Sequence, residues 1–306
     1  MTPPTTSSQA YAADPRNEHV LVYVNGEFVP RSTAYVSIFD AGFVCGDGVW
    51  EGVRIVNGNV VSFDAHIDRL LQGAASIMLD IGMGRAALKQ VILDTFARND
   101  MHDGAHARLM ITRGRKSTPN QDPRFTIGGA TIICVAEHKV IDPAAKQRGL
   151  KLFTSTFRCS GPDVFDLHLN SHSRLNLIQA LVQAIQAGAD EAVMLDPHGF
   201  VASCNSTNLF CVRQGELWTS TGRYNFNGIT RGTVLALARE AGITVREQDF
   251  TLAQLYSADE AFVTGTLGGL TPVRNIDGRD IGQGGFGPVT ARLNGLYQRF
   301  IGAAQG

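Results

Sequence analysis

The 306-residue sequence has few cysteines and no excess of charge of either sign. Its five cysteines include no C-x-x-C pair, which argues against a disulfide framework or a zinc site and favours a reduced, intracellular protein. Lysine and arginine number 27 against 28 acidic residues, so no basic field exists to gather nucleic acid or anionic lipid. No apolar run approaches the roughly 20 residues that a membrane span requires. We therefore expect a cytoplasmic protein with neither nucleic acid nor a membrane among its partners.

The composition is that of a folded chain with a large core. Hydrophobic residues make up 44% of the sequence and charged residues 18%. The length suggests about two domains of roughly 150 residues each. Residues 1–19 are polar and small, and they lack the basic start and apolar stretch of a secretory signal, so we expect a mobile tail there.

Local patterns divide the rest of the chain into two domains and a linker. Asn25-Gly26 and Asn57-Gly58 predict the turns of two hairpins. Two helices are expected over 63–81 and 85–100, and strands over 108–112 and 130–136. The polar segment 139–149 is expected to be a linker. The expected strands and helices beyond it are 150–156, 173–187, 192–195, 200–202, 208–212, 216–219, 230–241, 261–264 and 294–301. These elements predict an α+β chain with a small α+β domain over 20–138 and a larger, mainly β domain with helices over 150–306.

Three short motifs contain groups that can bind an anion. Asn227-Gly228-Ile229-Thr230 precedes a predicted helix, where unpaired backbone N–H groups and the helix dipole favour negative charge. Thr264-Gly265-Thr266 ends a predicted strand and offers N–H and hydroxyl donors. Arg69 can present a planar fork to a phosphate. Taken singly, each also fits an ordinary N-cap, a strand-ending turn or a surface arginine.

Three other polar segments have chemical potential. The glycine-rich segment 45–52 matches neither the dinucleotide fingerprint nor the P-loop. His168, Asn170 and His172 face one way in an extended chain, which fits acid–base chemistry or a solvated helix start; we expect no metal from two histidines and a distant Asp. Segment 203–208 can line a pocket or form a polar loop, and its Cys204 is a weak candidate nucleophile.

The order of these motifs resembles the class IV aminotransferases, the fold type IV pyridoxal-phosphate proteins. This family includes branched-chain aminotransferases, D-amino-acid aminotransferases and aminodeoxychorismate lyase. The segments that carry the resemblance are YVNGEFVP, CGDGVWEGVRI, FDAHIDRL, LMITRG, AGADEAVMLDPHGFV, NLFCV, NGITRGTVLALARE and DEAFVTGT. The resemblance runs from about Val20 to the C-terminus. It implies a two-domain fold, a homodimer, a small-molecule substrate, and a phosphate cup formed by Arg69, Ile229, Thr230 and Thr266.

The resemblance fails at two catalytic positions. The family has a lysine before the helix that leads to AGADEA, where it forms a Schiff base with the cofactor aldehyde. Counting back from Gly188 places Asn170 there, and no lysine occurs between residues 152 and 306. A glutamate that keeps the pyridine nitrogen protonated is replaced by Ser203. Because an amide cannot add to an aldehyde and a neutral hydroxyl cannot hold a pyridinium, pyridoxal phosphate is expected to bind, if at all, without a lysine Schiff base.

Three hypotheses for the function follow from this pattern. The first is an enzyme that has lost lysine-dependent transamination, keeps the phosphate cup and acts on a small amino- or carboxylate-bearing substrate. Its catalytic groups would be Asn170, His172, Ser203 and Asn205, with His172 as general acid or base. The second is a working aminotransferase of the branched-chain or D-amino-acid type, and the third is a ligand-binding pseudoenzyme. Tyr35 lies where the family has an aromatic residue beside the substrate, and Arg124 is a candidate carboxylate contact; a core tyrosine and an exposed surface arginine are the alternatives.

Overall fold

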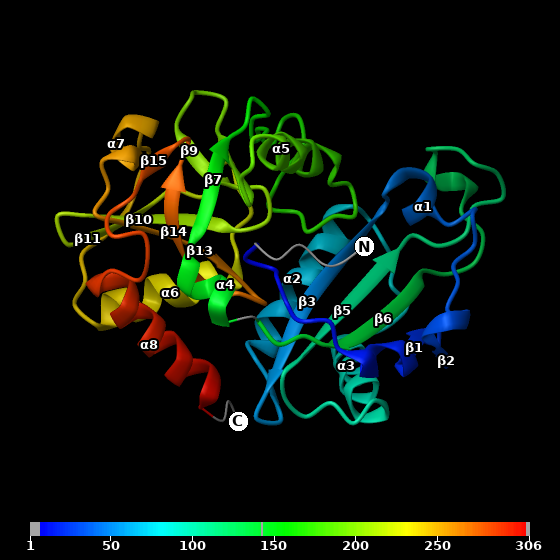
Figure 1. Cartoon of the computed structure of the whole chain (residues 1–306). Helices are drawn as coiled ribbons and strands as arrows, with labels where there is room; N and C mark the ends of the chain where they lie inside the picture. The colour runs from blue at the N-terminus through cyan, green and yellow to red at the C-terminus, as the bar shows by residue number, and fades with distance from the viewer. Residues whose placement is uncertain (1–6, 142, 304–306) are drawn as a thin grey trace. The chain divides into compact units, whose positions relative to one another are not determined.

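The computed structural model describes residues 7–141 and 143–303, and the chain divides into two compact units (Figure 1). The small unit comprises Ala13–Val140 and Leu169–Arg174. The large unit comprises residues 7–12, Ile141–His168 and Leu175–Ala303. In each unit a β-sheet packs against helices, which agrees with the α+β class expected from the sequence.

The small unit is built on a six-stranded antiparallel sheet with the order β2-β1-β6-β5-β3-β4. Both predicted Asn-Gly turns are present, since Asn25 and Asn57 adopt the positive φ that such hairpins need. The strands are β1 (Leu21–Val24), β2 (Glu27–Pro30), β3 (Gly48–Val56), β4 (Asn59–Val60), β5 (Ala105–Thr112) and β6 (Thr131–His138).

Two helices, α2 (Phe63–Ser76) and α3 (Arg85–Arg98), cover one face of this sheet and bury the core of the unit. Helix α2 ends five residues before the expected boundary because Met78 adopts a positive φ, although Leu79 and Ile81 remain buried. The short helices of the unit are η1 (Pro15–His19), η2 (Arg31–Thr33), α1 (Ala41–Cys45) and η3 (Pro123–Phe125).

The large unit contains a mixed sheet with the order β12-β11-β10-β13-β14-β7-β8-β9, and β15 pairs with β14. The strands are β7 (Leu150–Thr154), β8 (Glu191–Leu195), β9 (Val201–Cys204), β10 (Asn208–Arg213), β11 (Glu216–Thr219), β12 (Val245–Glu247), β13 (Glu260–Gly265), β14 (Gly269–Ile276) and β15 (Arg279–Asp280). The sequence patterns predicted neither β12 nor the hairpin partners β14 and β15.

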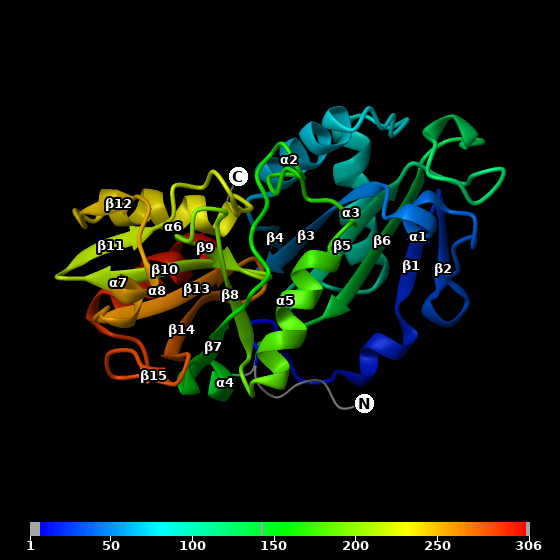
Figure 2. The same ribbon diagram turned by 90° about the horizontal axis from the view of Figure 1, so that it is seen from above.

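Helices pack against this sheet from several segments of the chain. Figure 1 shows α6 and α8 side by side, and Figure 2 shows α5 running along β7 and β8. The helices are α4 (Pro143–Arg148), α5 (Leu175–Gln186), α6 (Ile229–Glu240), α7 (Leu252–Tyr256) and α8 (Pro288–Gly302). Among the described residues no helix has both the length and the apolar character to cross a bilayer.

The two units differ from the expected domains at three places. The segment 139–149, expected to be a linker, contains helix α4. Leu169–Arg174 belongs to the small unit although the sequence placed it within 150–306. Within the expected tail, residues 1–6 lie outside the described residues, whereas Ser8, Ala10 and Asn17 are buried. Tertiary contacts hold these segments, and no local sequence pattern reports such contacts.

Candidate functional site

The start of helix α6 forms one side of a polar site in the large unit. Gly228 is the N-cap and makes no side-chain capping bond, and the helix begins at Ile229, one residue before the predicted start at Thr230. The side chain of Asn208 fixes this turn: its Oδ1 accepts from Gly228 N at 3.2 Å, and its Nδ2 donates to Phe226 O at 2.7 Å. Backbone N–H groups in the first turn of a helix have no intrahelical acceptor and favour an anion.

The Thr264-Gly265-Thr266 turn adjoins the same asparagine. Strand β13 pairs with β10 so that Thr264 lies opposite Asn208. Thr264 is buried, and its hydroxyl has no hydrogen-bond partner among the described residues. A buried hydroxyl without a partner costs free energy, which a ligand atom in this position would recover. Helix α6 and the end of β13 therefore bring hydrogen-bond donors together around Asn208, which makes this corner a candidate anion-binding corner.

The residues after strand β9 reach this corner as well. Ser203 is buried, donates its hydroxyl to Thr207 O at 2.8 Å, and lies 3.4 Å from Asn208 Nδ2. Asn205 has a different role, because its Oδ1 accepts from Ala192 N at 2.8 Å and thereby joins β8 to the loop after β9. Cys204 is buried, and burial raises the pKa of its thiol well above the ordinary value, which makes it a poor nucleophile.

Glu191 is a buried carboxylate that the sequence patterns did not identify. It begins strand β8, is 1% exposed, and accepts from Thr207 Oγ1 at 2.6 Å. It also accepts from the backbone N–H and the hydroxyl of Ser8. Burial raises the pKa of Glu191 above its usual range. The only sequence signal was an acidic residue at the start of a fully apolar strand.

The small unit holds Arg69 in a fixed orientation. Its Nε and Nη2 donate to the two carboxylate oxygens of Glu51 at 2.7 and 2.8 Å, and His66 Nδ1 lies 2.7 Å from Glu51 Oε2. Burial would raise the pKa of Glu51, but its hydrogen bonds to Arg69 and His66 lower that pKa overall. This bidentate pair orients the guanidinium predicted to contact a phosphate.

The segment that contains Asn170 is bound to strand β3. Asn170 Nδ2 donates to Trp50 O at 2.6 Å, and its Oδ1 accepts from Arg174 Nη2. Trp50 N donates to Asn170 O at 3.0 Å, and Trp50 Nε1 donates to Ser171 O at 3.1 Å. Asn170 is only 5% exposed. Both ends of its amide are engaged, so the side chain fastens this segment to the sheet.

His172 and two arginines lie close to Trp50. The guanidinium carbons of Arg108 and Arg174 lie 3.7 and 4.8 Å from the indole centroid. In the described part of the chain, the Arg108 guanidinium has no hydrogen-bonded or ion-paired acceptor. Burial lowers the pKa of His172, and the positive charges of Arg108 and Arg174 lower it further, to about 4. Its Nε2 is buried and has no hydrogen-bond partner among the described residues. The sequence analysis did not identify Arg108 as a site residue. Its position as the only arginine in the mainly apolar strand β5 could have indicated it.

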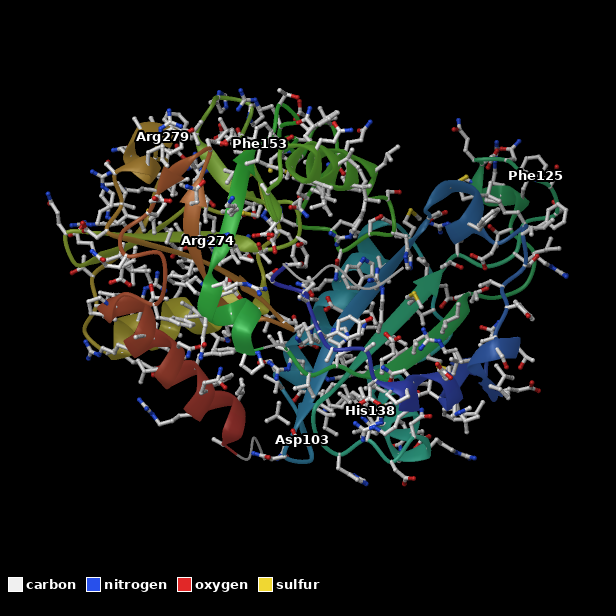
Figure 3. All side chains as sticks on the ribbon, in the orientation of Figure 1. Asp103, Phe125, His138, Phe153, Arg274 and Arg279 are labelled. Atoms are coloured by element: carbon white, nitrogen blue, oxygen red, sulfur yellow. The ribbon has the colours of Figure 1, made fainter. Side chains whose placement is uncertain are left out.

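The two predicted substrate residues lie on exposed loops of the small unit. Tyr35 is 77% exposed and lines a cavity of about 280 Å³ together with Asp40 and Arg115. Arg124 pairs with Asp122 at 2.6 Å on the loop between β5 and β6, next to Phe125, which Figure 3 labels at the outer end of that loop. In the large unit, His168 lies between Asp166 Oδ1 at 2.6 Å and Gly222 O at 2.9 Å.

The elements of the two α+β units and the motifs within them define a known family. A family model described as amino-transferase class IV matches residues 48–276. The chain belongs to the class IV aminotransferase family, and its fold is the fold type IV that the motifs predicted.

Relatives and solved structures agree with this membership. A putative branched-chain-amino-acid aminotransferase of Methanocaldococcus jannaschii is 40% identical over 90% of this chain and 95% of its own length. Branched-chain-amino-acid aminotransferase-like protein 2 of Arabidopsis thaliana is 39% identical over 93% of this chain, and the match spans only 51% of the plant protein. The chain thus covers about half the length of that relative. The T.th. branched-chain amino acid aminotransferase, solved with pyridoxamine 5'-phosphate, superposes with a TM-score of 0.86 at 30% identity, covering 92% of this chain and 94% of that chain.

Proposed function

We propose that this protein is a class IV aminotransferase-family enzyme that has diverged from lysine-dependent transamination. In this proposal it keeps a phosphate-binding site for a pyridoxal-phosphate type of cofactor and acts on a small substrate with an amino group or a carboxylate. The proposal rests on the absence of any lysine between residues 152 and 306 and on the predicted alignment of Asn170 with the Schiff-base lysine of the family; the amide of Asn170 is hydrogen-bonded to Trp50 and Arg174.

The residues of the large unit fit the phosphate of such a cofactor but do not fit its covalent attachment. The first turn of α6, with Thr230, and the Thr264–Thr266 turn supply N–H and hydroxyl donors. Neither of the two lysines in the described part of the large unit is a candidate for this attachment. Lys151 is exposed on β7, and Lys146 Nζ donates to Gly268 O at 3.1 Å. Ser203 is neutral and already donates to Thr207 O. In this proposal the large unit therefore supplies neither an amine for the cofactor aldehyde nor an acid for its ring nitrogen.

The small unit supports a carboxylate-bearing substrate. Arg108 presents a partly buried guanidinium without a described acceptor, beside the flat face of Trp50. A guanidinium in these surroundings binds a carboxylate through two parallel hydrogen bonds. The lowered pKa keeps His172 neutral at pH 7, and its buried Nε2, which has no hydrogen-bond partner among the described residues, is placed to accept a proton from a bound substrate as a general base.

The relatives favour a second candidate, a working aminotransferase, because several of them are named branched-chain or D-alanine aminotransferases. This candidate requires an amine from another lysine or from the substrate itself. Turnover of an amino acid with a keto-acid acceptor would support it. Ligand binding without turnover over a broad substrate panel would instead indicate a pseudoenzyme.

We also propose a cytoplasmic homodimer. Helix α5 presents an exposed apolar stripe whose spacing places its members on one helical face. The stripe consists of Leu175, Ile178, Val182 and Ile185, with exposed fractions of 68%, 54%, 45% and 61%. Exposed apolar faces of this kind are typical of subunit interfaces.

The decisive experiment compares pyridoxal phosphate with pyridoxamine phosphate, which has no aldehyde. We expect both to bind reversibly, and pyridoxal without its phosphate to bind far more weakly. After borohydride reduction, mass spectrometry should find no stoichiometric adduct on a single lysine. Lys146→Arg is the control for incidental labelling near Gly268. A stoichiometric adduct on one lysine would refute the proposal and restore the aminotransferase hypothesis, and failure of both ligands to bind would refute the phosphate site.

A further inference from the structure

An N-terminal strap, defined here as residues 7–10, docks on the large unit. Ser8 and Ala10 are 3% and 5% exposed, and Ala10 N donates to Ser7 O at 3.0 Å, which turns the strap back on itself. The strap is joined to strand β8 through Glu191, because Ser8 N lies 3.3 Å from Glu191 Oε1 and the Ser8 hydroxyl donates to the same oxygen. Hydrogen bonds to a buried carboxylate are among the stronger ones in proteins.

Two glycines lie where the strap crosses the turn after strand β13. A Cβ atom on Gly268 would come within 2.7 Å of Ser8 O, closer than real Cβ contacts allow. A Cβ atom on Gly265 would lie 3.5 Å from Gln9 Nε2 and also 3.5 Å from Thr207 Cγ2. Backbone packs directly on backbone at Gly268, so the strap and the turn can approach only because no side chain separates them.

A continuous set of contacts connects the strap to the anion-binding corner. Glu191 Oε2 accepts from Thr207 Oγ1 at 2.6 Å, and Thr207 O accepts from Ser203 Oγ at 2.8 Å. Gly265 is the middle residue of the Thr264–Thr266 turn, and a Cβ atom on it would lie 3.5 Å from the methyl carbon of Thr207. Each carboxylate oxygen of Glu191 thus has a separate function: one binds the strap, and the other orients Thr207 against the turn.

We propose that Ser8 and Glu191 are positioning residues of the anion site, and that the docked strap holds the Thr264–Thr266 turn in its ligand-binding position. This inference rests on the proposed function, which makes that turn part of a phosphate site. Displacement of the strap weakens binding of the phosphorylated ligand, and bound ligand stabilises the docked strap by the same factor, as linkage requires.

The first test displaces the strap without altering any polar group. Gly268→Ala adds a methyl group against Ser8 O, whereas the control Gly285→Ala adds one where nothing lies within 4 Å. Chymotrypsin cleavage after Tyr11 reports strap release, and titration with pyridoxamine phosphate reports affinity. We expect Gly268→Ala to accelerate cleavage and to weaken binding by about tenfold, with Gly285→Ala unchanged. Saturating ligand should slow cleavage of the wild-type chain.

The second test addresses Glu191 and remains informative if Gly268→Ala does not fold. Glu191→Gln keeps an acceptor for Ser8 N and can donate to the Thr207 hydroxyl, so we expect near wild-type binding. Glu191→Leu should weaken pyridoxamine phosphate about tenfold. Thr219→Val is the matched control, because it removes a buried 2.8 Å hydrogen bond of the same unit away from the strap.

The outcomes separate the inference from the proposed function. Released strap in Gly268→Ala with unchanged ligand affinity would overturn the inference, as would equal affinity in Glu191→Leu and Glu191→Gln. A Thr219→Val variant as weak as Glu191→Leu would show that general destabilisation causes the loss and would also overturn it. If the wild-type chain binds no pyridoxamine phosphate, the proposed function fails first.

Discussion

The role of Asn170 can be tested by replacing it with alanine. The sequence predicts a catalytic role for this residue, at the position where the family is expected to have its lysine, whereas the structure shows its amide bonded to Trp50 O at 2.6 Å and to Arg174. A fastening role and a catalytic role predict different results. Removal of a fastening residue lowers stability, whereas removal of an exposed catalytic amide lowers activity with little change in stability.

The expected loss of stability follows from the two hydrogen bonds. The neutral bond to Trp50 O contributes about 0.5–1.5 kcal/mol, and the charge-assisted bond from Arg174 about 1.5–3 kcal/mol. The free energy of unfolding should therefore fall by about 2–4.5 kcal/mol. At about 2–4 °C per kcal/mol, the melting temperature should fall by roughly 4–18 °C.

The assay is thermal unfolding followed by circular dichroism or calorimetry, together with urea titration. Ser173→Ala is the control in the same segment, because exposed Ser173 donates to Gly46 O at 3.1 Å and should cost less than about 1 kcal/mol. A melting temperature of Asn170→Ala within about 2 °C of wild type would refute the fastening role. Lost activity at unchanged stability would instead restore the catalytic role.

Three further predictions concern the small unit and the subunit interface. Arg108→Leu should weaken a carboxylate-bearing ligand by about 10–150-fold, measured by calorimetry, since one charge-assisted contact contributes about 1.5–3 kcal/mol; unchanged affinity would remove Arg108 from the substrate site. The pKa of His172 is lowered from 6.5 to about 4 in the folded state, so the contribution of this residue to stability is fully present above pH 6.5 and is lost as the pH falls towards 4. The wild-type chain should lose about 3 kcal/mol over that interval relative to His172→Gln, measured by urea titration, and parallel pH profiles would contradict this. Ile178→Lys should convert a dimer to a monomer in light scattering, whereas Asn176→Lys, which helical spacing places off the apolar stripe, should not; a wild-type chain with the mass of a monomer would refute the dimer.

Local patterns predicted the elements whose physical causes are local. Asn-Gly pairs specify their hairpins because asparagine and glycine tolerate positive φ, and both hairpins of the small unit form as expected. The first turn of α6 and the end of β13 are likewise placed by their own residues, Ile229, Thr230 and Thr266. The patterns missed β14, whose partner strand β7 lies far away in the chain, and they also missed a local cause, the positive φ of Met78, which ends helix α2 at Ser76.

The sequence by itself indicated the family and the fold, because both depend only on which residue types occur in which order; that Asn170 occupies the lysine position is a prediction of the same kind. The tertiary structure decided what those residues do. In the folded chain the amide of Asn170 is hydrogen-bonded to Trp50 and Arg174, and the Arg108 guanidinium has no acceptor among the described residues. Ser8 is buried against Glu191, which lies 183 residues away in the chain. Hydrogen bonds and burial depend on which atoms meet in space, and a linear sequence does not contain that proximity.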